Sequence, residues 1–216
     1  MYYIKLLNKI SDLIYSNLTP DLFEVTDDMA EASGILVRSA NMHDMDLPAS
    51  LLGIARAGAG VNNIPLDKCT DKGIVVFNTP GANANAVKEL VLAALFLSSR
   101  KINAGIEWVK SLKGKGGEIP KLIEKGKSNF TGPEISGKKL GVIGLGAIGA
   151  QVANDAHAIG MEVTGYDPFI SIQAAWSLSR AVHRADSLDS LLEESDYITI
   201  HIPLLPDTRN FINQET

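Results

Sequence analysis

The sequence predicts an α/β protein with two parallel sheets, and three observations support this prediction. Short β-rich runs alternate with helix-like stretches in both halves of the 216-residue chain, which is the pattern of repeated βαβ units. A polar stretch containing glycine and proline separates the two halves, as a connection over the surface would. Apolar residues make up 45% of the chain and charged residues 21%, which is the composition of an ordinary globular protein.

The first half supplies four predicted strands. They are short runs rich in apolar residues, at Tyr2–Leu7, Gly34–Arg38, Leu52–Arg56 and Gly73–Asn78. Asp67–Lys72 predicts a short crossover helix. Ala84–Leu112 predicts one long helix or a bent pair, because apolar side chains recur there at helical spacing. The glycine-rich segment 113–117 ends this helix, and an excursion over the surface continues to Lys139.

The second half begins a new series of elements. Three strands are predicted, at Leu140–Ile143, Met161–Tyr166 and Tyr197–Ile202. Two helices are predicted, at Ala147–Ile159 and Leu188–Glu194. We place the boundary between a first domain, residues 1–98, and a second domain, residues 99–216, inside the long helix.

A glycine-rich turn follows the first strand of the second half, with the sequence Gly144-Leu-Gly146-Ala-Ile-Gly149. In this context Gly144 permits a tight turn, Gly146 lets the backbone approach a pyrophosphate, and Gly149 lets the next helix lie close to the strand. Asp167 comes 18 residues after Gly149, at the end of the next strand. A carboxylate there can accept hydrogen bonds from both ribose hydroxyls and would repel a 2′-phosphate. The pattern predicts a Rossmann domain that binds NAD in preference to NADP; the alternative is a glycine-rich turn with a capping aspartate.

Three further residues lie near the end of the last predicted strand. His201 and Pro203 are at its carboxyl end, which borders the crevice where doubly wound sheets bind ligands. His201 either contacts the cofactor or caps the strand. Thr208 either donates its hydroxyl to a phosphate or ribose, or stabilises the turn that precedes it.

Two arginines close strands in the first half. Arg38 and Arg56 both end predicted parallel strands, so both guanidinium groups are expected at the same edge of the sheet. The loop Ala57–Gly60 follows directly, and its backbone N–H groups can gather around a carboxylate. Two cations beside such a loop predict a pocket for a small dianion that carries phosphate. The alternative is a pair of solvent-facing arginines. Asn83 is a helix-cap candidate that could also reach a ligand.

Five stretches of the chain match, in the same order, those of a known family. They are Ile35–Ala40, Ala55–Asn63, Val76–Leu90, the glycine-rich turn and His201–Thr208. On these residues the chain resembles the D-2-hydroxyacid dehydrogenase family, and within it the D-3-phosphoglycerate dehydrogenases. The resemblance implies a flavodoxin-like substrate-binding domain followed by an incomplete Rossmann NAD-binding domain. The implied reaction is the NAD-dependent oxidation of D-3-phosphoglycerate to 3-phosphohydroxypyruvate in serine biosynthesis.

The resemblance also assigns roles by position. It places Arg38 and Arg56 on the phosphate and carboxylate of the substrate. The other implied substrate contacts are Ala59, Gly60, Val61 and Asn83. Implied neighbours of NAD, besides the three glycines, are Ala147, Ile148, Asp167, His201, Pro203 and Thr208. In this family the catalytic arginine, glutamate and histidine come after the segment that ends at Thr216, so we expect no catalytic residue in this chain and no turnover by it alone.

The residues themselves also leave the proton-transfer group unassigned. Oxidation of a hydroxy acid needs a base with a pKa near 7, usually a histidine held by a carboxylate. The four histidines are His43, His157, His183 and His201, and none is predicted in a cleft beside an acid. The 216 − 144 = 72 residues after Gly144 suffice for one βαβαβ half. Two alternatives stay open: a dehydrogenase of another D-2-hydroxy acid, and a noncatalytic NAD-binding or dimerising module.

The composition argues against several kinds of partner. Twenty Lys and Arg against 25 Asp and Glu give a net charge of −5, which disfavours nucleic acid. The longest apolar run, Leu90–Leu97, is too short to span a membrane. Cys69 is the single cysteine, and no His/Cys cluster predicts a metal site. We expect a cytoplasmic protein that binds a small phosphorylated hydroxy acid and forms a homodimer or homotetramer when complete.

Overall fold

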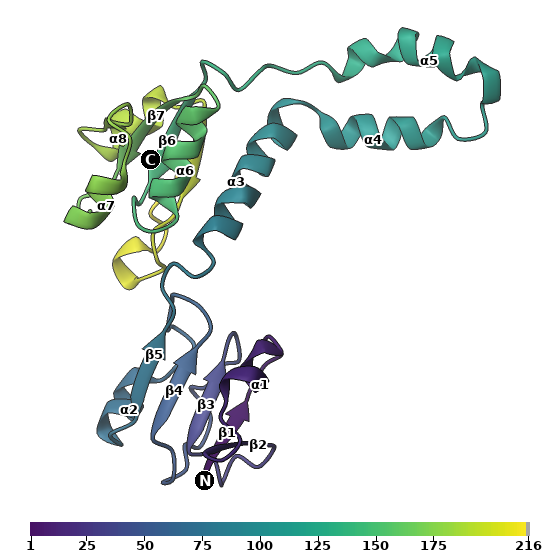
Figure 1. The fold of residues 1–216 in the computed structure, drawn as a ribbon. Coiled ribbons are helices and arrows are strands. Elements are labelled where there is room, and N and C mark those ends of the chain that lie inside the picture. Colours follow the sequence, from purple (N-terminus) through teal and green to yellow (C-terminus); the bar gives the residue numbers. More distant parts are fainter. Residues whose placement is uncertain (215–216) are drawn as a thin grey trace. The chain divides into compact units, whose positions relative to one another are not determined.

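The computed structural model describes residues 1–214 and divides into two compact units (Figure 1). The first unit is Met1–Asn83 and the second begins at Ala84. Each unit contains one parallel sheet, which confirms the predicted α/β class.

The first unit is built on a five-stranded sheet in which every pair of neighbours is parallel. Its strands are β1 (Tyr2–Leu6), β2 (Phe23–Thr26), β3 (Gly34–Val37), β4 (Gly53–Arg56) and β5 (Val75–Asn78). The order is β2-β1-β3-β4-β5, one of the two common orders of doubly wound sheets. Four strands agree with the prediction. The edge strand β2 was not predicted; it is short and pairs only with β1.

Two short helices accompany these five strands in the described part of the unit, α1 (Leu13–Asn17) and α2 (Leu66–Asp71). The order of the strands is that expected of a flavodoxin-like domain, but this thin helical cover leads us to describe the unit only as a parallel α/β sheet.

The core of the first unit lies on one face of its sheet. Ile35, Ile54 and Val76 are register partners on adjacent strands, so their side chains share that face. Ile35 and Ile54 are almost fully buried and pack with Met42, Leu47, Ile64 and Cys69. On the opposite face Val75 and Phe77 remain 53% and 62% exposed. The carboxyl ends of β3 and β4 are thereby fixed side by side above a packed layer.

The second unit is built on a four-stranded parallel sheet. Its strands are β6 (Lys139–Ile143), β7 (Glu162–Tyr166), β8 (His183–Arg184) and β9 (Tyr197–Ile200). The order β8-β7-β6-β9 corresponds to the first four strands of the Rossmann order 3-2-1-4-5-6. The sequence analysis predicted no strand at the two-residue β8, because so short a strand has no pattern of its own. The direction of the strand order changes between β6 and β9.

The helices of the second unit agree with the prediction in the fingerprint region and differ before it. They are α3 (Ala84–Ser99), α4 (Ile102–Ser111), η1 (Gly116–Glu118), α5 (Ile119–Gly126), η2 (Lys127–Phe130), α6 (Gly149–Ala158), α7 (Ile172–Ser177), α8 (Leu188–Glu194) and η3 (Pro206–Thr208). The long predicted helix is the bent pair α3 and α4, divided at Lys101, which has a left-handed φ of 49°. The predicted excursion contains the helix α5. Trp108 of α4 stacks on Phe130, with ring centroids 4.9 Å apart.

Helices cover both faces of the second sheet. On one face α6 packs on Leu140, Val142 and Val163, and Leu95 of α3 joins the same cluster. On the other face Leu191 of α8 packs on Ile143. Lys88 of α3 forms an ion pair with Asp155 of α6 at 2.6 Å. Because α3 packs on α6 over its length, the structure divides the chain before Ala84, earlier than the predicted boundary at residues 98 and 99.

No helix in the described part of the chain is long and apolar enough to cross a membrane.

Candidate cofactor and substrate sites

The glycine-rich turn of the second unit is shaped by close backbone packing. Gly144 has a φ of +88°, and a Cβ atom there would lie 2.9 Å from the backbone carbon of His201. A Cβ atom on Gly149 would overlap the carbonyl oxygen of Gly144, whereas one on Gly146 would meet nothing within 4 Å. Two glycines are therefore required by packing, and the third leaves open space over the backbone.

The open space at Gly146 faces a set of free donors. The structure shows no acceptor within residues 1–214 for the backbone N–H groups of Gly146, Ala147 and Ile148. The ten-residue helix α6 begins at Gly149, so the positive end of its dipole adds to these donors. This arrangement can bind an anionic group such as a pyrophosphate.

Asp167 lies directly after β7 and is tied to the glycine-rich turn. Its Oδ2 atom accepts a hydrogen bond of 2.8 Å from the N–H of Leu145, and its Oδ1 atom accepts one of 2.9 Å from the N–H of Phe169. A carboxylate oxygen has further lone pairs, so both oxygens can still accept hydrogen bonds from hydroxyl groups. Asp167 therefore lies at the end of β7 beside the glycine-rich turn, and its contact with a ribose stays a prediction.

A cavity of about 320 Å³ adjoins Asp167. Its walls are largely apolar and include Leu145, Ile170, Leu178 and Val182. A cavity with apolar walls and a carboxylate at its rim suits a flat heterocycle attached to a ribose.

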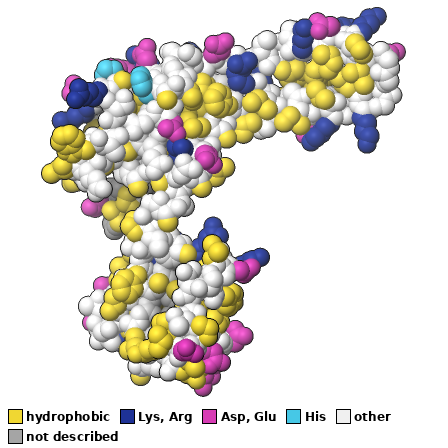
Figure 2. Space-filling model, in the orientation of Figure 1, with side chains coloured by type: hydrophobic (Ala, Val, Ile, Leu, Met, Phe, Trp, Pro, Cys, Tyr) yellow, Lys and Arg dark blue, Asp and Glu magenta, His cyan; other side chains and the backbone are white. Residues whose placement is uncertain are grey.

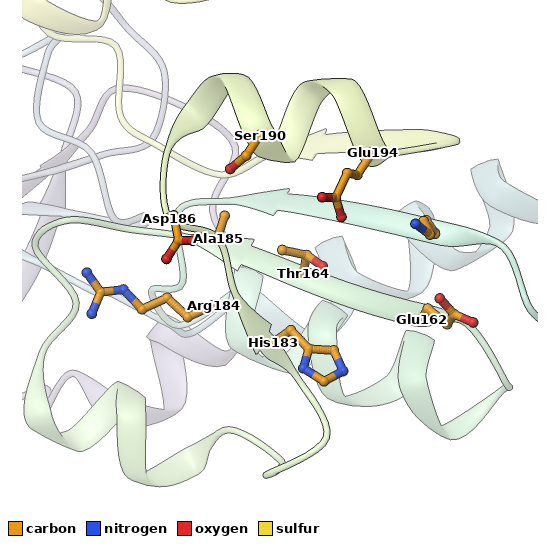
Figure 3. A pocket seen from close by; sticks show the side chains of 9 residues that line it. Glu162, Thr164, His183, Arg184, Ala185, Asp186, Ser190 and Glu194 are labelled. Atoms are coloured by element: carbon orange, nitrogen blue, oxygen red, sulfur yellow. The ribbon is translucent and has the colours of Figure 1, made fainter.

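A second hollow, of about 230 Å³, lies on the α8 face of the same sheet (Figure 3). Ser190 and Glu194 of α8 lie over Thr164 and Glu162 of β7, with His183 at the edge strand. Its walls carry both signs of charge. It does not include Asp167 or the glycine-rich turn, so we do not assign it to the dinucleotide.

His201 lies just after β9, where β9 meets β6. Its N–H donates to the carbonyl of Ile143 at 2.7 Å, and its ring Nε2 atom lies 2.9 Å from Oγ1 of Thr199. Burial lowers the pKa of His201, because desolvation disfavours the charged imidazolium. The residue therefore presents a neutral ring at neutral pH beside the turn that collects free N–H donors.

Pro203 and Thr208 belong to the loop after β9. The hydroxyl of Thr208 donates to the carbonyl of Pro203 at 2.6 Å and accepts from the N–H of Leu205 at 2.8 Å. These bonds close a turn within the loop, which is the structural alternative weighed for Thr208. The cofactor contacts of Pro203 and Thr208 stay predictions.

The two arginines of the first unit meet at the carboxyl edge of its sheet. Arg56 is the last residue of β4. Its register partner in β3 is Val37, and Arg38 follows Val37 directly. The Nε atom of Arg56 donates to the backbone carbonyl of Arg38 at 3.1 Å. A Cβ atom on Gly58 would lie 2.8 Å from Nη1 of Arg56, and one on Gly60 3.5 Å from it. The guanidinium group of Arg56 therefore lies over the glycine-rich loop.

That loop offers backbone donors beside the guanidinium group. Within the described residues, the N–H groups of Ala59, Gly60 and Val61 have no acceptor in the protein. Asn78 holds the loop from β5, since its Nδ2 atom donates to the carbonyl of Ala59 at 2.6 Å. Thr79 accepts from the N–H of Gly58 at 2.8 Å. Sequence reasoning missed Asn78 and Thr79, although their place at the end of a predicted strand was a signal.

Other candidate residues stand apart from these arrangements. Asn83 is exposed and ends the first unit, so its ligand contact stays a prediction. His43 contacts the carbonyl of Asn62 at 2.9 Å. None of the four histidines pairs with a carboxylate in residues 1–214. Over the same residues, no three side chains of His, Cys, Asp or Glu gather as metal ligands.

Comparisons with known proteins show the family of the chain. Residues 92–216 match the family model described as D-isomer specific 2-hydroxyacid dehydrogenase, NAD binding domain. The chain is 37% identical over 216 residues to D-3-phosphoglycerate dehydrogenase of Methanocaldococcus jannaschii, covering 98% of this chain and 38% of that protein. It is 38% identical to the protein of the same name from Synechocystis, covering 89% of this chain and 33% of that protein. The chain thus spans less than half the length of these relatives.

Solved structures show the same fold. The NAD⁺-bound 3-phosphoglycerate dehydrogenase of Entamoeba histolytica has 26% identity and a TM-score of 0.68, covering 96% of this chain and 64% of that one. A putative D-isomer specific 2-hydroxyacid dehydrogenase from Polaromonas has 21% identity and a TM-score of 0.79, covering 100% of this chain and 69% of that one.

The different surroundings of Gly146 and Gly149 give a test of the dinucleotide site. Gly149→Ala should destabilise the second unit by about 1–3 kcal/mol, because the new methyl group overlaps the Gly144 carbonyl. Gly146→Ala should leave the melting temperature unchanged and weaken NAD binding about tenfold or more, because its methyl group enters the open space. Thermal unfolding and NAD titration measure both. Full NAD affinity in Gly146→Ala would refute the assignment.

The half-buried imidazole of His201 predicts a pH dependence. Its folded-state pKa is lowered, so the unfolded chain takes up this proton first as the pH falls. The contribution to stability is present above about pH 6.5, the usual pKa of histidine, and is lost as the pH falls through the folded-state value. An NMR titration of the ring should give a midpoint below 6.5, and His201→Gln should flatten the unfolding profile in this range. A midpoint at or above 6.5 would contradict the burial argument.

Proposed function

The chain belongs to the D-isomer specific 2-hydroxyacid dehydrogenases, and from this membership we propose that it supplies the substrate-binding and NAD-binding parts of a D-3-phosphoglycerate dehydrogenase. The reaction would oxidise the C2 hydroxyl of D-3-phosphoglycerate to the ketone of 3-phosphohydroxypyruvate, a step toward serine. The placement of Arg38 and Arg56 at one edge of the first sheet is the observation that supports D-3-phosphoglycerate as the substrate.

NAD is the cofactor of the second unit, since the matched family model is an NAD-binding domain. In our proposal the free N–H groups of Gly146, Ala147 and Ile148 hold the pyrophosphate. The carboxylate of Asp167 accepts the ribose hydroxyls, and the adjoining cavity of about 320 Å³ receives the adenine. A carboxylate at this position favours NAD, because it would repel the 2′-phosphate of NADP.

D-3-Phosphoglycerate fits the first unit by charge. It carries a phosphate and a carboxylate. The guanidinium group of Arg56 lies over the loop that holds the N–H groups of Ala59, Gly60 and Val61, and the exposed Arg38 directly follows the neighbouring strand β3. A planar guanidinium binds carboxylate or phosphate through two parallel hydrogen bonds. The relatives named D-3-phosphoglycerate dehydrogenase support this choice over an unphosphorylated acid.

The described residues account for binding rather than for proton transfer. Bound NAD would accept the hydride from C2 of the hydroxy acid. The hydroxyl proton needs a base with a pKa near 7, and His201, whose ring contacts Thr199, has a pKa lowered by burial. We propose that the 216-residue chain binds both ligands without turning them over.

The substrate proposal predicts a charge-dependent preference. D-3-Phosphoglycerate should bind the chain about tenfold or more tightly than D-glycerate, because glycerate lacks the phosphate that the second arginine holds. Arg38→Ala and Arg56→Ala should each weaken binding of D-3-phosphoglycerate by a similar factor. Calorimetric or NMR titration measures these affinities, and NADH absorbance detects any turnover.

Arg180→Ala is a matched control, because Arg180 is an exposed arginine of the second unit. It should leave the affinity for D-3-phosphoglycerate unchanged. Equal binding of glycerate and D-3-phosphoglycerate, or full binding by both arginine variants, would refute the proposed substrate.

We also propose that the chain self-associates through residues 101–130, which we call the arm (Figure 2). One side of α4, with Gly105 and Trp108, contacts Phe130. An adjoining side of α4 presents an apolar stripe, Ile102, Ile106 and Val109, which are 38%, 48% and 53% exposed.

Charge supports a second copy as the partner of the arm. The arm contains seven lysines and three glutamates, so its net charge is 7 − 3 = +4, whereas the remainder of the chain carries −5 − 4 = −9. A basic arm with an apolar stripe therefore complements the acidic remainder of another copy.

Sedimentation velocity tests this self-association. The wild-type chain should sediment as a dimer or larger, and Ile106→Asp should shift it to a monomer, because a charge within the stripe must be desolvated in the interface. Ile172→Asp is the control, since Ile172 is an apolar residue of α7 that is 80% exposed. A monomeric wild-type chain, or a dimer that Ile106→Asp leaves intact, would refute the proposal.

A further inference from the structure

A single side-chain oxygen organises the turn after β3. Asn8 lies just beyond β1 and is half-buried. Its Oδ1 atom accepts hydrogen bonds from the backbone N–H groups of Arg38, Ser39 and Ala40, at 2.9, 2.9 and 3.0 Å. The three donors are consecutive, so the backbone of the turn curls around one point.

Consecutive N–H groups that converge in this way form a nest, a backbone shape suited to an anionic or carbonyl oxygen. An amide oxygen has two lone pairs, so three donors saturate it. If the oxygen were removed, three N–H groups, of which that of Ala40 is partly buried, would lose their acceptor, and nothing would hold the turn in this shape. The conformation of the turn therefore depends on Asn8.

One peptide group connects Asn8 to Arg56. The N–H of Ser39 and the carbonyl of Arg38 belong to the same planar peptide, on opposite sides of it. The N–H points to Asn8, and the carbonyl accepts the Nε atom of Arg56 at 3.1 Å. Since the peptide is rigid, the hydrogen bond from the Ser39 N–H to Asn8 also sets the direction of the Arg38 carbonyl.

The position of the Arg38 carbonyl also affects the candidate anion site formed by Arg56 and the loop after it. With Nε engaged by this carbonyl, the terminal nitrogens of Arg56 remain for a ligand, and Nη1 lies over the loop at Gly58 and Gly60. A ligand that uses both the guanidinium group and the loop N–H groups needs them in a fixed relation. The Arg38 backbone is held by the same nest, so both arginines start from positions that Asn8 sets.

We infer that Asn8 is a positioning residue of the substrate site, which holds the Arg38–Ser39 peptide so that Arg56 faces the ligand over the Ala59–Val61 loop. The inference rests on the proposed function, in which Arg38 and Arg56 bind the phosphate and carboxylate. Asn8 itself need not touch the substrate.

The test compares Asn8→Ala, Asn8→Asp and the wild-type chain by NMR hydrogen exchange and by titration with D-3-phosphoglycerate. In Asn8→Ala, the Ser39 amide and the Arg56 Nε–H group should exchange about tenfold faster, and the affinity should fall about tenfold. Exchange of the core amides of the first unit, such as those of Ile35 and Ile54, should stay unchanged, which separates this effect from general destabilisation of that unit. Asn8→Asp should restore protection of the Arg38, Ser39 and Ala40 amides, because its carboxylate accepts the same bonds.

Asn17→Ala is the matched control, because the Asn17 side chain donates within its own helix α1; it should behave as wild type in both measurements. If Asn8→Ala does not fold, Asn8→Gln should show the same faster exchange and weaker binding, because it displaces the acceptor oxygen by one methylene group. Wild-type exchange of Arg56 Nε–H in these variants, or unprotected amides in Asn8→Asp, would overturn the inference. A wild-type chain that binds no D-3-phosphoglycerate would count against the proposed function alone, and the exchange rates would still decide the role of Asn8.

Discussion

The close approach of three backbone segments at Gly144 is the constraint on which the second unit depends. Gly144 lies against the backbone of His201, and Gly149 lies against the carbonyl of Gly144. β6, β9 and α6 therefore meet at residues without side chains. This packing brings the first turn of α6 and the end of β9 to one point, and the free N–H groups between Gly146 and Ile148 result from it. The cofactor site is thus a property of backbone packing more than of individual side chains.

In the first unit, side-chain amides rather than glycines set the conformation of the backbone at the candidate site. Its strands β3 and β4 end side by side, but a strand end alone leaves the following turns free to vary. Asn8 fixes the turn at Arg38, and Asn78 fixes the loop at Ala59. The Arg38–Ser39 peptide joins the first of these to Arg56. Neutral amides suit this task, because they orient backbone groups without adding a charge beside the arginines.

The sequence predicted those features whose cause is local. Strands β6 and β7, the glycine-rich turn and the place of Asp167 follow from short patterns, and the structure agrees with each. Strand β8 has only two residues and exists because β7 pairs with it. The three bonds to Asn8 join residues about 30 positions apart. No local pattern encodes these contacts.

The net charge of −5 is compatible with two anionic ligands because the sites act at short range. Exposed charges more than about 8–10 Å apart are largely screened at physiological salt, so distant carboxylates contribute little repulsion at either site. The pyrophosphate site uses backbone dipoles, which carry no net charge, and the lowered pKa of His201 keeps its ring neutral beside them. The proposed substrate site would use the guanidinium groups of Arg38 and Arg56. A long polyanion would have to cross the acidic remainder of the surface, whereas a small phosphorylated acid meets only the local donors. A net charge of −5 is therefore compatible with small anionic ligands and disfavours long polyanions.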